Sequence, residues 1–176
     1  MTSSSDKAVT HERGFQLQNA HWLWLSAALI LLDQISKQLI HRQFDLYESV
    51  AVLPVFNIVH RRNTGVAFSM FSDSPQLFFV GLALAVSVGI LIWLRRHPSD
   101  QPLVAVALCL ILAGAIGNAI DRALRGYVVD FLDFHWAGWH FPAFNVAGTA
   151  ITIGAGLMIL DAILDWRRSR AAGSTS

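Results

Sequence analysis

Charged side chains are scarce in this chain. Asp, Glu, Lys and Arg make up 14% of its 176 residues, hydrophobic residues make up 54%, and the mean hydropathy is +0.47. A soluble domain averages about 25% charged residues, so this composition excludes a water-soluble enzyme with polar outer faces. The net charge of +1 is too small and too dispersed for a nucleic-acid-binding protein, which would carry a basic stripe. The class that remains is a small membrane protein.

Cysteine is almost absent as well. The single Cys109 excludes a disulfide scaffold and a multi-cysteine metal site. It lies in an uncharged run without a basic neighbour, which disfavours a thiolate nucleophile. The sequence also lacks the His-Glu-x-x-His pattern of zinc proteases and the Gly-x-Ser-x-Gly pattern of serine hydrolases. Any hydrolytic chemistry therefore depends on carboxylates, and we expect neither a metal ion nor another cofactor.

Four apolar segments are long enough, or nearly so, to cross a bilayer as helices, which takes about 20 residues. They are Trp22–Ile40, Leu77–Leu94, Leu103–Ile120 and Ala143–Leu160. The last is rich in glycine and alanine, which allow helices to pack closely in lipid. We predict an all-α membrane protein with four transmembrane helices in one domain, residues 22–165. A polar tail would precede it at 1–21, and a basic, then small-residue tail would follow it at 166–176.

Basic residues suggest how these helices are oriented. Four spans place both termini on one side of the membrane, and the turn near residue 95 lies on the same side. This side carries seven Lys and Arg residues: Lys7, Arg13, Arg95, Arg96, Arg167, Arg168 and Arg170. The other side carries five, Arg42, Arg61, Arg62, Arg122 and Arg125, in longer loops. The positive-inside rule then predicts cytoplasmic termini, with 41–76 and 121–142 facing outward.

The outward segments contain strand and turn signals. Val50–His60 is β-branched and apolar but is interrupted by Pro54, which predicts an edge strand or a piece lying on the membrane surface. Asn63–Phe68 begins with a turn signal and continues into an apolar stretch.

The polar residues of these regions allow structural and functional interpretations. Asp33 and Lys37, spaced i,i+4, either neutralise each other or contact a substrate. Asp130 lies among apolar residues, and a carboxylate in that setting indicates function because its burial is expensive. Asp133 is expected to be a solvated loop acid. His135 and His140, in a Trp-rich loop, are expected to anchor the interface rather than bind a metal.

Five short motifs resemble the motif blocks of bacterial lipoprotein signal peptidase (signal peptidase II), in the same order, over roughly residues 20–165. They are Asp33-Gln-Ile-Ser-Lys37, Asn63-Thr-Gly-Val-Ala-Phe68, Gly117-Asn-Ala-Ile-Asp-Arg122, Val128-Val-Asp-Phe131 and Phe141-Pro-Ala-Phe-Asn-Val-Ala147. The resemblance implies a four-helix aspartyl endopeptidase of the bacterial inner membrane, with an extracytoplasmic β-cradle and an active site near the outer face. It implies diacylglyceryl-modified prolipoproteins as substrates and contact with membrane lipid. From the charge we expect no nucleic-acid partner, and we expect a monomer, although the sequence does not reveal the oligomeric state.

The resemblance also implies roles for individual residues. The family activates water with two aspartates, of which the first matches Asp130 and the second falls on Gly148. Two close carboxylates share one proton, so that the ionised one accepts a proton from water and the neutral one donates to the substrate carbonyl. With glycine at 148 these roles cannot both be filled. Other residues match supporting or substrate-facing positions: Asp33, Lys37, Asn63, Asn118, Asp121, Arg122 and Asn145.

Three functions therefore stay open. The chain is an impaired peptidase, or a pseudoprotease that captures lipidated signal peptides, or a small transporter. The transporter is disfavoured because Leu77–Leu94 offers no polar side chain except Ser87. Replacement of the missing acid by Asp121 or Asp133 would require a rearranged site.

Overall fold

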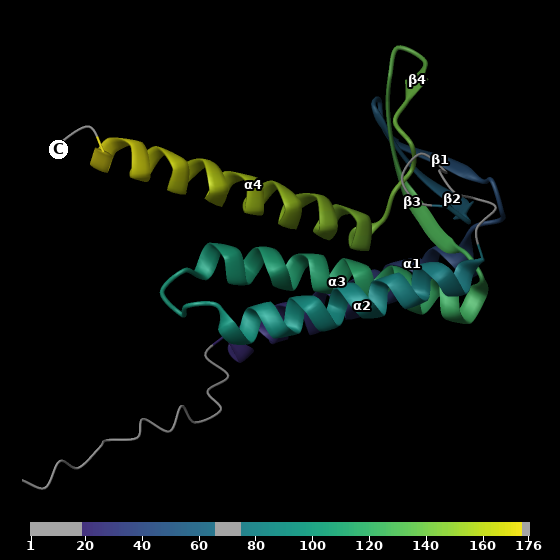
Figure 1. The fold of residues 1–176 in the computed structure, drawn as a ribbon. Helices are drawn as coiled ribbons and strands as arrows, with labels where there is room; N and C mark the ends of the chain where they lie inside the picture. The colour runs from purple at the N-terminus through teal and green to yellow at the C-terminus, as the bar shows by residue number, and fades with distance from the viewer. Residues whose placement is uncertain (1–18, 66–74, 174–176) are drawn as a thin grey trace, which may run out of the picture.

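Four long helices form the body of the protein. The computed structural model describes residues 19–65 and 75–173. A short 3-10 turn, η1 (Ala20–Trp22), leads into α1 (Leu23–Gln43), which is followed by α2 (Gln76–Arg96), α3 (Pro102–Arg125) and α4 (Val146–Gly173) (Figure 1). All four are long and apolar enough to cross a membrane, which confirms the four predicted spans.

The helix ends follow local signals. Gly126 adopts a left-handed conformation, φ +76°, and ends α3, as glycine commonly does after a last helical turn. The fourth helix begins at Val146 rather than 143, after Asn145, whose side-chain oxygen accepts a hydrogen bond from Gly148 N at 2.7 Å. It runs on to Gly173, past residue 165, because 161–172 contain no glycine or proline to stop it.

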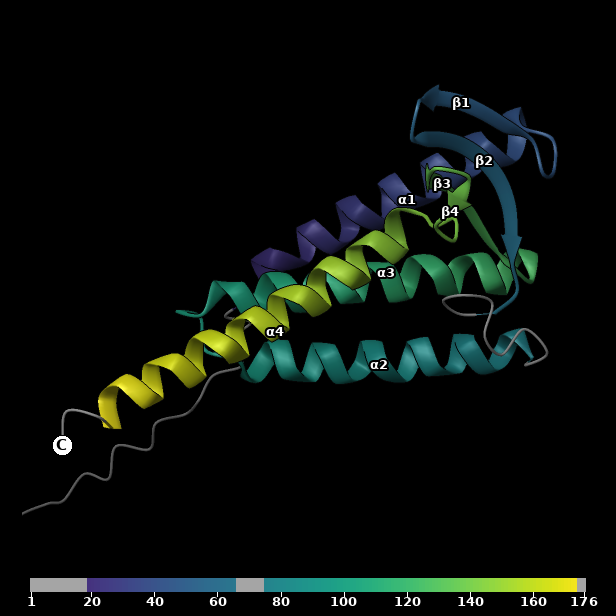
Figure 2. The ribbon, with the colours of Figure 1, turned by 90° about the horizontal axis from the view of Figure 1, so that it is seen from above.

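The central element is α3, which packs against α1, α2 and α4 (Figure 2). Its buried residues include Ala105, Leu108 and Cys109. Helix α4 comes very close, because a Cβ added at Gly114 would lie 2.3 Å from Ala147 O, and one at Gly154 would lie 2.7 Å from Ala107 O. The small residues predicted to allow close packing therefore do so at the contact between α3 and α4.

A small antiparallel sheet lies at one end of the helices. Its strands are β1 (Ser49–Leu53), β2 (Phe56–Asn63), β3 (Val128–Trp136) and β4 (Trp139–His140), in that order. Pro54 falls between β1 and β2, so the predicted strand at 50–60 is a hairpin. The sheet lies where α1 and α3 end and α4 begins, so it brings β3 beside the start of α4 (Figure 2). The expected β-cradle is therefore present.

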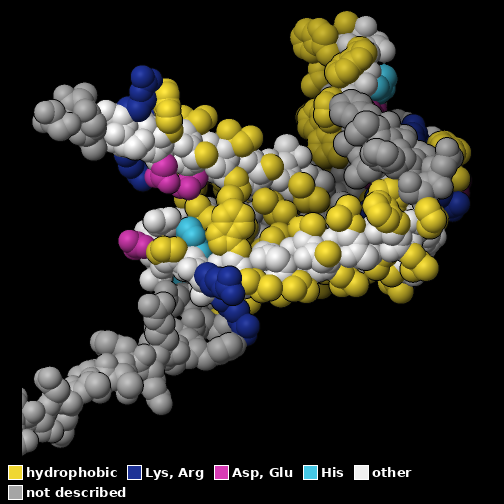
Figure 3. Space-filling view, viewed as in Figure 1, with side chains coloured by type: hydrophobic (Ala, Val, Ile, Leu, Met, Phe, Trp, Pro, Cys, Tyr) yellow, Lys and Arg dark blue, Asp and Glu magenta, His cyan; other side chains and the backbone are white. Residues whose placement is uncertain are grey.

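The outer surface of the helices is apolar. Exposed side chains include Trp24 and Leu31 on α1 and Leu77 and Leu84 on α2. Figure 3 shows hydrophobic side chains along the helices, with Lys and Arg gathered at the left, where α4 ends and α2 turns into α3. An apolar helical surface of this kind fits lipid rather than water, so the chain is a multi-pass membrane protein.

Candidate active site

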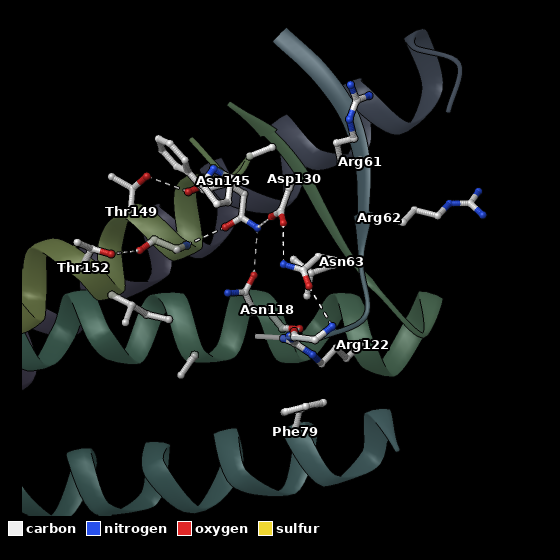
Figure 4. A pocket seen from close by; sticks show the side chains of 18 of the residues that line it. Arg61, Arg62, Asn63, Phe79, Asn118, Arg122, Asp130, Asn145, Thr149 and Thr152 are labelled. Atoms are coloured by element: carbon white, nitrogen blue, oxygen red, sulfur yellow. Dashed lines mark hydrogen bonds between the residues drawn. The ribbon is translucent and has the colours of Figure 1, made fainter. Parts of the chain in front are cut away.

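Asp130 is the carboxylate at the polar end of a deep groove. It lies in β3, is 5% exposed, and both of its oxygens accept hydrogen bonds (Figure 4). Asn63 Nδ2 donates to Oδ2 at 2.9 Å, and Asn145 Nδ2 donates to Oδ1 at 2.7 Å. Burial raises the pKa of Asp130 to about 6, even though both amides and the charges of Lys37 and Arg122 favour the ionised form. A carboxyl group with such a pKa can exchange a proton near neutral pH.

The two asparagines have fixed orientations. Asn63 Oδ1 accepts Gly65 N at 3.0 Å, and Asn145 Oδ1 accepts Gly148 N at 2.7 Å. In each amide the oxygen accepts a backbone N–H and the nitrogen donates to Asp130. A flipped amide would lose both hydrogen bonds, so each side chain has one favoured orientation. Asn145 links Asp130 directly to the first turn of α4, where position 148 lies.

A buried cluster of ionic groups lies next to Asp130 and its two asparagines. Lys37 Nζ lies 2.8 Å from Asp33 Oδ2, 3.2 Å from Asp121 Oδ2 and 3.0 Å from Asn118 Oδ1. Arg125 pairs with Asp121 Oδ1. The other oxygen of Asp33, Oδ1, accepts the backbone N–H of Ala147 at 2.8 Å, and Asp121 Oδ2 also accepts the backbone N–H of Val129 at 3.0 Å. The charges of the two acidic and two basic side chains thus balance. Their contacts connect α1, α3, β3 and α4.

The groove itself has a volume of about 1290 Å³ and runs between α2, α3 and α4. Its polar end holds six of the residues singled out from the sequence: Asn63, Asn118, Arg122, Asp130, Asn145 and Gly148. Along the helices its walls are apolar, with Leu82 and Val86 from α2, Ile111 from α3, and Ile151 and Ile153 from α4. Asp33, Lys37 and Asp121 do not line it, and their partners make them supports of the site.

Position 148 is open. Within the part of the chain that the structure describes, a Cβ added at Gly148 would meet Asn145 Oδ1 alone, at 3.4 Å, which is ordinary contact. The residue lines the groove together with Asp130, and its backbone N–H is bound by Asn145, the same side chain that binds Asp130. Glycine is therefore not required here by packing, in contrast to Gly114 and Gly154.

Comparison with known proteins decides what this arrangement belongs to. The family model described as signal peptidase (SPase) II matches residues 25–164. The chain belongs to the signal peptidase II family. It is 49% identical over 150 residues to the lipoprotein signal peptidase of Haemophilus ducreyi, which covers 84% of this chain and 93% of that protein. It is also 49% identical over 146 residues to that of Shewanella pealeana, covering 81% and 86%.

A solved structure agrees with this assignment. A bacterial membrane enzyme at 2.3 Å resolution superposes with a TM-score of 0.78 and 31% sequence identity, covering 83% of this chain and 89% of that one. The fold class and the function class, a lipoprotein signal peptidase of the aspartic endopeptidase type, therefore stand as predicted from the five motifs.

Within this signal peptidase fold, neither candidate for the missing acid is free to replace it. Asp121 is fully buried among Lys37, Arg125 and the N–H of Val129. Asp133 was expected to be solvated, and that prediction is wrong: it is 6% exposed in β3. Asn57 Nδ2 donates to it at 2.9 Å and His140 Nδ1 lies 3.0 Å away. Burial alone would raise the pKa of Asp133, but these hydrogen bonds hold it below its usual value.

Several contacts of the signal peptidase site have no signal in the sequence. Asn57 and Arg125 complete the environments of Asp133 and Asp121, and Arg122 lies 4.9 Å over the ring of Phe79 on α2. Asn57 and Phe79 come from distant parts of the chain, so no local motif marks them, whereas Arg125 lies one helical turn after Asp121, outside the motif block. His135 and His140 stack at 4.9 Å, and among the described residues no group of three or more His, Cys, Asp or Glu could hold a metal ion. The Val66–Phe68 part of the second motif lies outside the described residues.

Proposed function

We propose that the chain binds diacylglyceryl-modified prolipoproteins in this groove, presents the peptide bond to Asp130, and cleaves it poorly or not at all. The observation that carries this is the position of Asp130, buried and doubly hydrogen-bonded beside a residue 148 that has no side chain. In this proposal residues 22–165 are the peptidase domain, and the membrane is the bacterial inner membrane, with the groove's polar end near its outer face.

The groove suits a lipidated peptide. Its apolar walls can accept acyl chains and the hydrophobic part of a signal peptide, while the polar end can bind a peptide backbone. Asn63 and Asn145 would hold Asp130 in place, and Asn118 would connect Asn145 to Lys37. Ionised Asp130 can take a proton from water, but nothing at position 148 can donate one to the carbonyl oxygen.

The direct test introduces the absent acid. We expect Gly148→Asp to raise cleavage of a diacylglyceryl prolipoprotein by at least about 10²-fold, since a positioned acid contributes about 10²–10⁴-fold. Gly148→Asn, which has the same shape but no acid, is the matched control and should leave cleavage low. If the unmodified chain cleaves as fast as Gly148→Asp, the assignment of position 148 is wrong, and Asp121 and Asp133 would be replaced next.

Capture without cleavage is the second candidate function. It is favoured by the retained groove and by the intact support of Asp130, neither of which a protein without a ligand needs. The Gly148→Asp variant supplies an enzyme for the test. An excess of the unmodified chain should slow cleavage by that variant because it removes substrate. An excess of the Asp130→Asn variant of the unmodified chain should slow cleavage equally. No slowing would contradict the capture function.

A further inference from the structure

The space beside Gly148 is open at the point where the first carbon of a side chain would lie. An aspartate side chain consists of a methylene and a carboxyl group, the same heavy atoms as acetic acid. Among residues 19–65 and 75–173, the neighbour within 4 Å of the position that the methylene would take is Asn145 Oδ1. Because Gly148 also lines the groove, the space is connected to its 1290 Å³ volume, and a small molecule can enter from there.

Asp130 retains the capacity to bind an acid in that space. Its two oxygens each accept one amide hydrogen bond, whereas a carboxylate has about four acceptor sites. A carboxylic O–H bound to a carboxylate is a short, charge-assisted hydrogen bond, stronger than a neutral one.

The charges around Asp130 suit such a pair. The cluster of Asp33, Lys37, Asp121 and Arg125 is neutral in sum. Arg61, Arg62 and Arg122 line the groove, and of these Arg122 favours the ionised form of Asp130. Two carboxyl groups that share one proton carry one negative charge in all, the same as ionised Asp130 alone. Arg122 can therefore balance the pair as well as the single residue.

We propose that a small monocarboxylic acid, formic or acetic acid, binds between Gly148 and Asp130 and acts as the second carboxyl group of the site. The inference rests on the proposed function. Water oxygen bonds to the scissile carbonyl carbon while Asp130 takes one water proton, and the bound acid gives its proton to the carbonyl oxygen. When the C–N bond breaks, the proton on Asp130 moves to the leaving nitrogen and the oxygen-bound proton returns to the small carboxylate. Peptide and water are consumed, and the acid is regenerated.

The experiment measures cleavage of a diacylglyceryl prolipoprotein by the full chain in detergent, with sodium formate or acetate added from millimolar to molar concentration. Sodium chloride at equal ionic strength and fixed pH is the reference. We expect a saturable rise of at least about tenfold with the acids and none with chloride. An untethered acid should recover only part of the 10²–10⁴-fold contribution of a positioned one.

Three variants separate the outcomes. Asp130→Asn should not respond to either acid, and Gly148→Val, whose side chain fills the space, should lose the response. Gly148→Asp should cleave without any addition. If Gly148→Asp cleaves while the acids leave the unmodified chain unchanged, the inference is overturned and the proposed function stands. If Gly148→Asp also fails, the proposed function falls with it. Stimulation of Asp130→Asn equal to that of the unmodified chain would overturn the inference as a solvent effect.

The pH dependence provides a second readout. The bound pair contains one proton. Lys37 from α1 and Arg122 from α3 favour the ionised form of Asp130, and Arg61 and Arg62 from β2 and Asp133 from β3 also line the groove. Between the pKa of formic acid and the pKa of Asp130, about 6, formate is ionised and Asp130 already holds this proton, so stimulation at fixed total formate should be flat. Above it a proton must be taken up, and stimulation should fall about tenfold per pH unit. A response that rises with pH above 7 would contradict a shared proton.

Discussion

At the scale of single residues, the proposed function gives the chain one side chain fewer than a complete aspartyl dyad. Gly148 has room for a Cβ, and the groups that would surround an aspartate there, Asp130 and Asn145, are in place. Since packing does not require glycine, an acid at 148 should fit without moving the backbone. The site is therefore preorganised around a position that offers no functional group.

Asp130 itself should make stability depend on pH. Its pKa is raised from 3.8 to about 6 in the folded protein, so between pH 4 and 6 the folded state binds more protons than the unfolded state. The contribution of Asp130 to the free energy of unfolding should therefore be highest below pH 4. It should fall by about 3 kcal/mol as the pH rises through 6. The measurement is the free energy of unfolding in detergent relative to Asp130→Asn, which has no charge to lose. A difference between the two proteins that is constant from pH 4 to 7 would contradict the raised pKa.

Sequence reasoning at this scale reaches the residues that carry motifs, and their roles stay predictions. It singled out Asp130, Asn63, Asn145 and Gly148, which the fold brings to one end of one groove. It was wrong for Asp133, whose burial depends on Asn57 from β2 and His140 from β4. Neither partner is marked by local pattern, because strand pairing decides which side chains face a given carboxylate.

At the scale of elements, the contact between α3 and α4 fixes the site, since Asn145 and Gly148 move with α4. We expect Gly114→Ala and Gly154→Ala each to destabilise the protein by about 1–3 kcal/mol, because the added methyl would meet the backbone oxygen of Ala147 or Ala107. Gly89→Ala on α2, where nothing lies within 4 Å, is the matched control and should cause no loss. Thermal unfolding in detergent measures all three, and equal stability of the three variants would contradict the close approach.

The buried ionic cluster also acts between elements. Replacing Lys37 by methionine leaves Asp33 and Asp121 without their shared cation, and breaking a buried pair typically costs about 3–5 kcal/mol. Arg168→Met removes the partner of Asp165 in an exposed pair, and should cost about 0–1 kcal/mol. The measurement is the free energy of unfolding of Lys37→Met and of Arg168→Met. A normal stability for Lys37→Met with lost substrate binding would instead favour the substrate-facing role.

Helix positions were predictable from long apolar runs, but helix ends were not. The run Ala143–Leu160 predicts a span, whereas the structure begins α4 at Val146 and continues it to Gly173. The start depends on the side-chain cap of Asn145, and the end on the absence of a stop signal in a polar, helix-favouring segment. Hydropathy reports where lipid can surround a helix, and it does not report where the helix stops in water.

At the scale of the whole molecule, the sheet and the candidate site are concentrated at one end. The sheet, Asp130 and the groove's polar residues lie where α1 and α3 end and α4 begins. The opposite end carries Arg95, Arg96, Arg167, Arg168 and Arg170 and the turn between α2 and α3. Cytoplasmic loops carry an excess of Lys and Arg, so this asymmetry predicts that the basic end lies in the cytoplasm and the site faces outward.

Thiol labelling can test this orientation. Cys109 is buried within α3, so Cys109→Ala provides a background without a native cysteine. In it, Ala137→Cys at the tip of the β3–β4 hairpin and Ser99→Cys in the turn between α2 and α3 are exposed and lie at opposite ends. A membrane-impermeant maleimide applied to spheroplasts should label the first, and should label the second only after the membrane is disrupted. The reverse pattern would place Asp130 at the cytoplasmic face, where a peptidase could not act on signal peptides after translocation, and would overturn both the orientation and the substrate proposed for the groove.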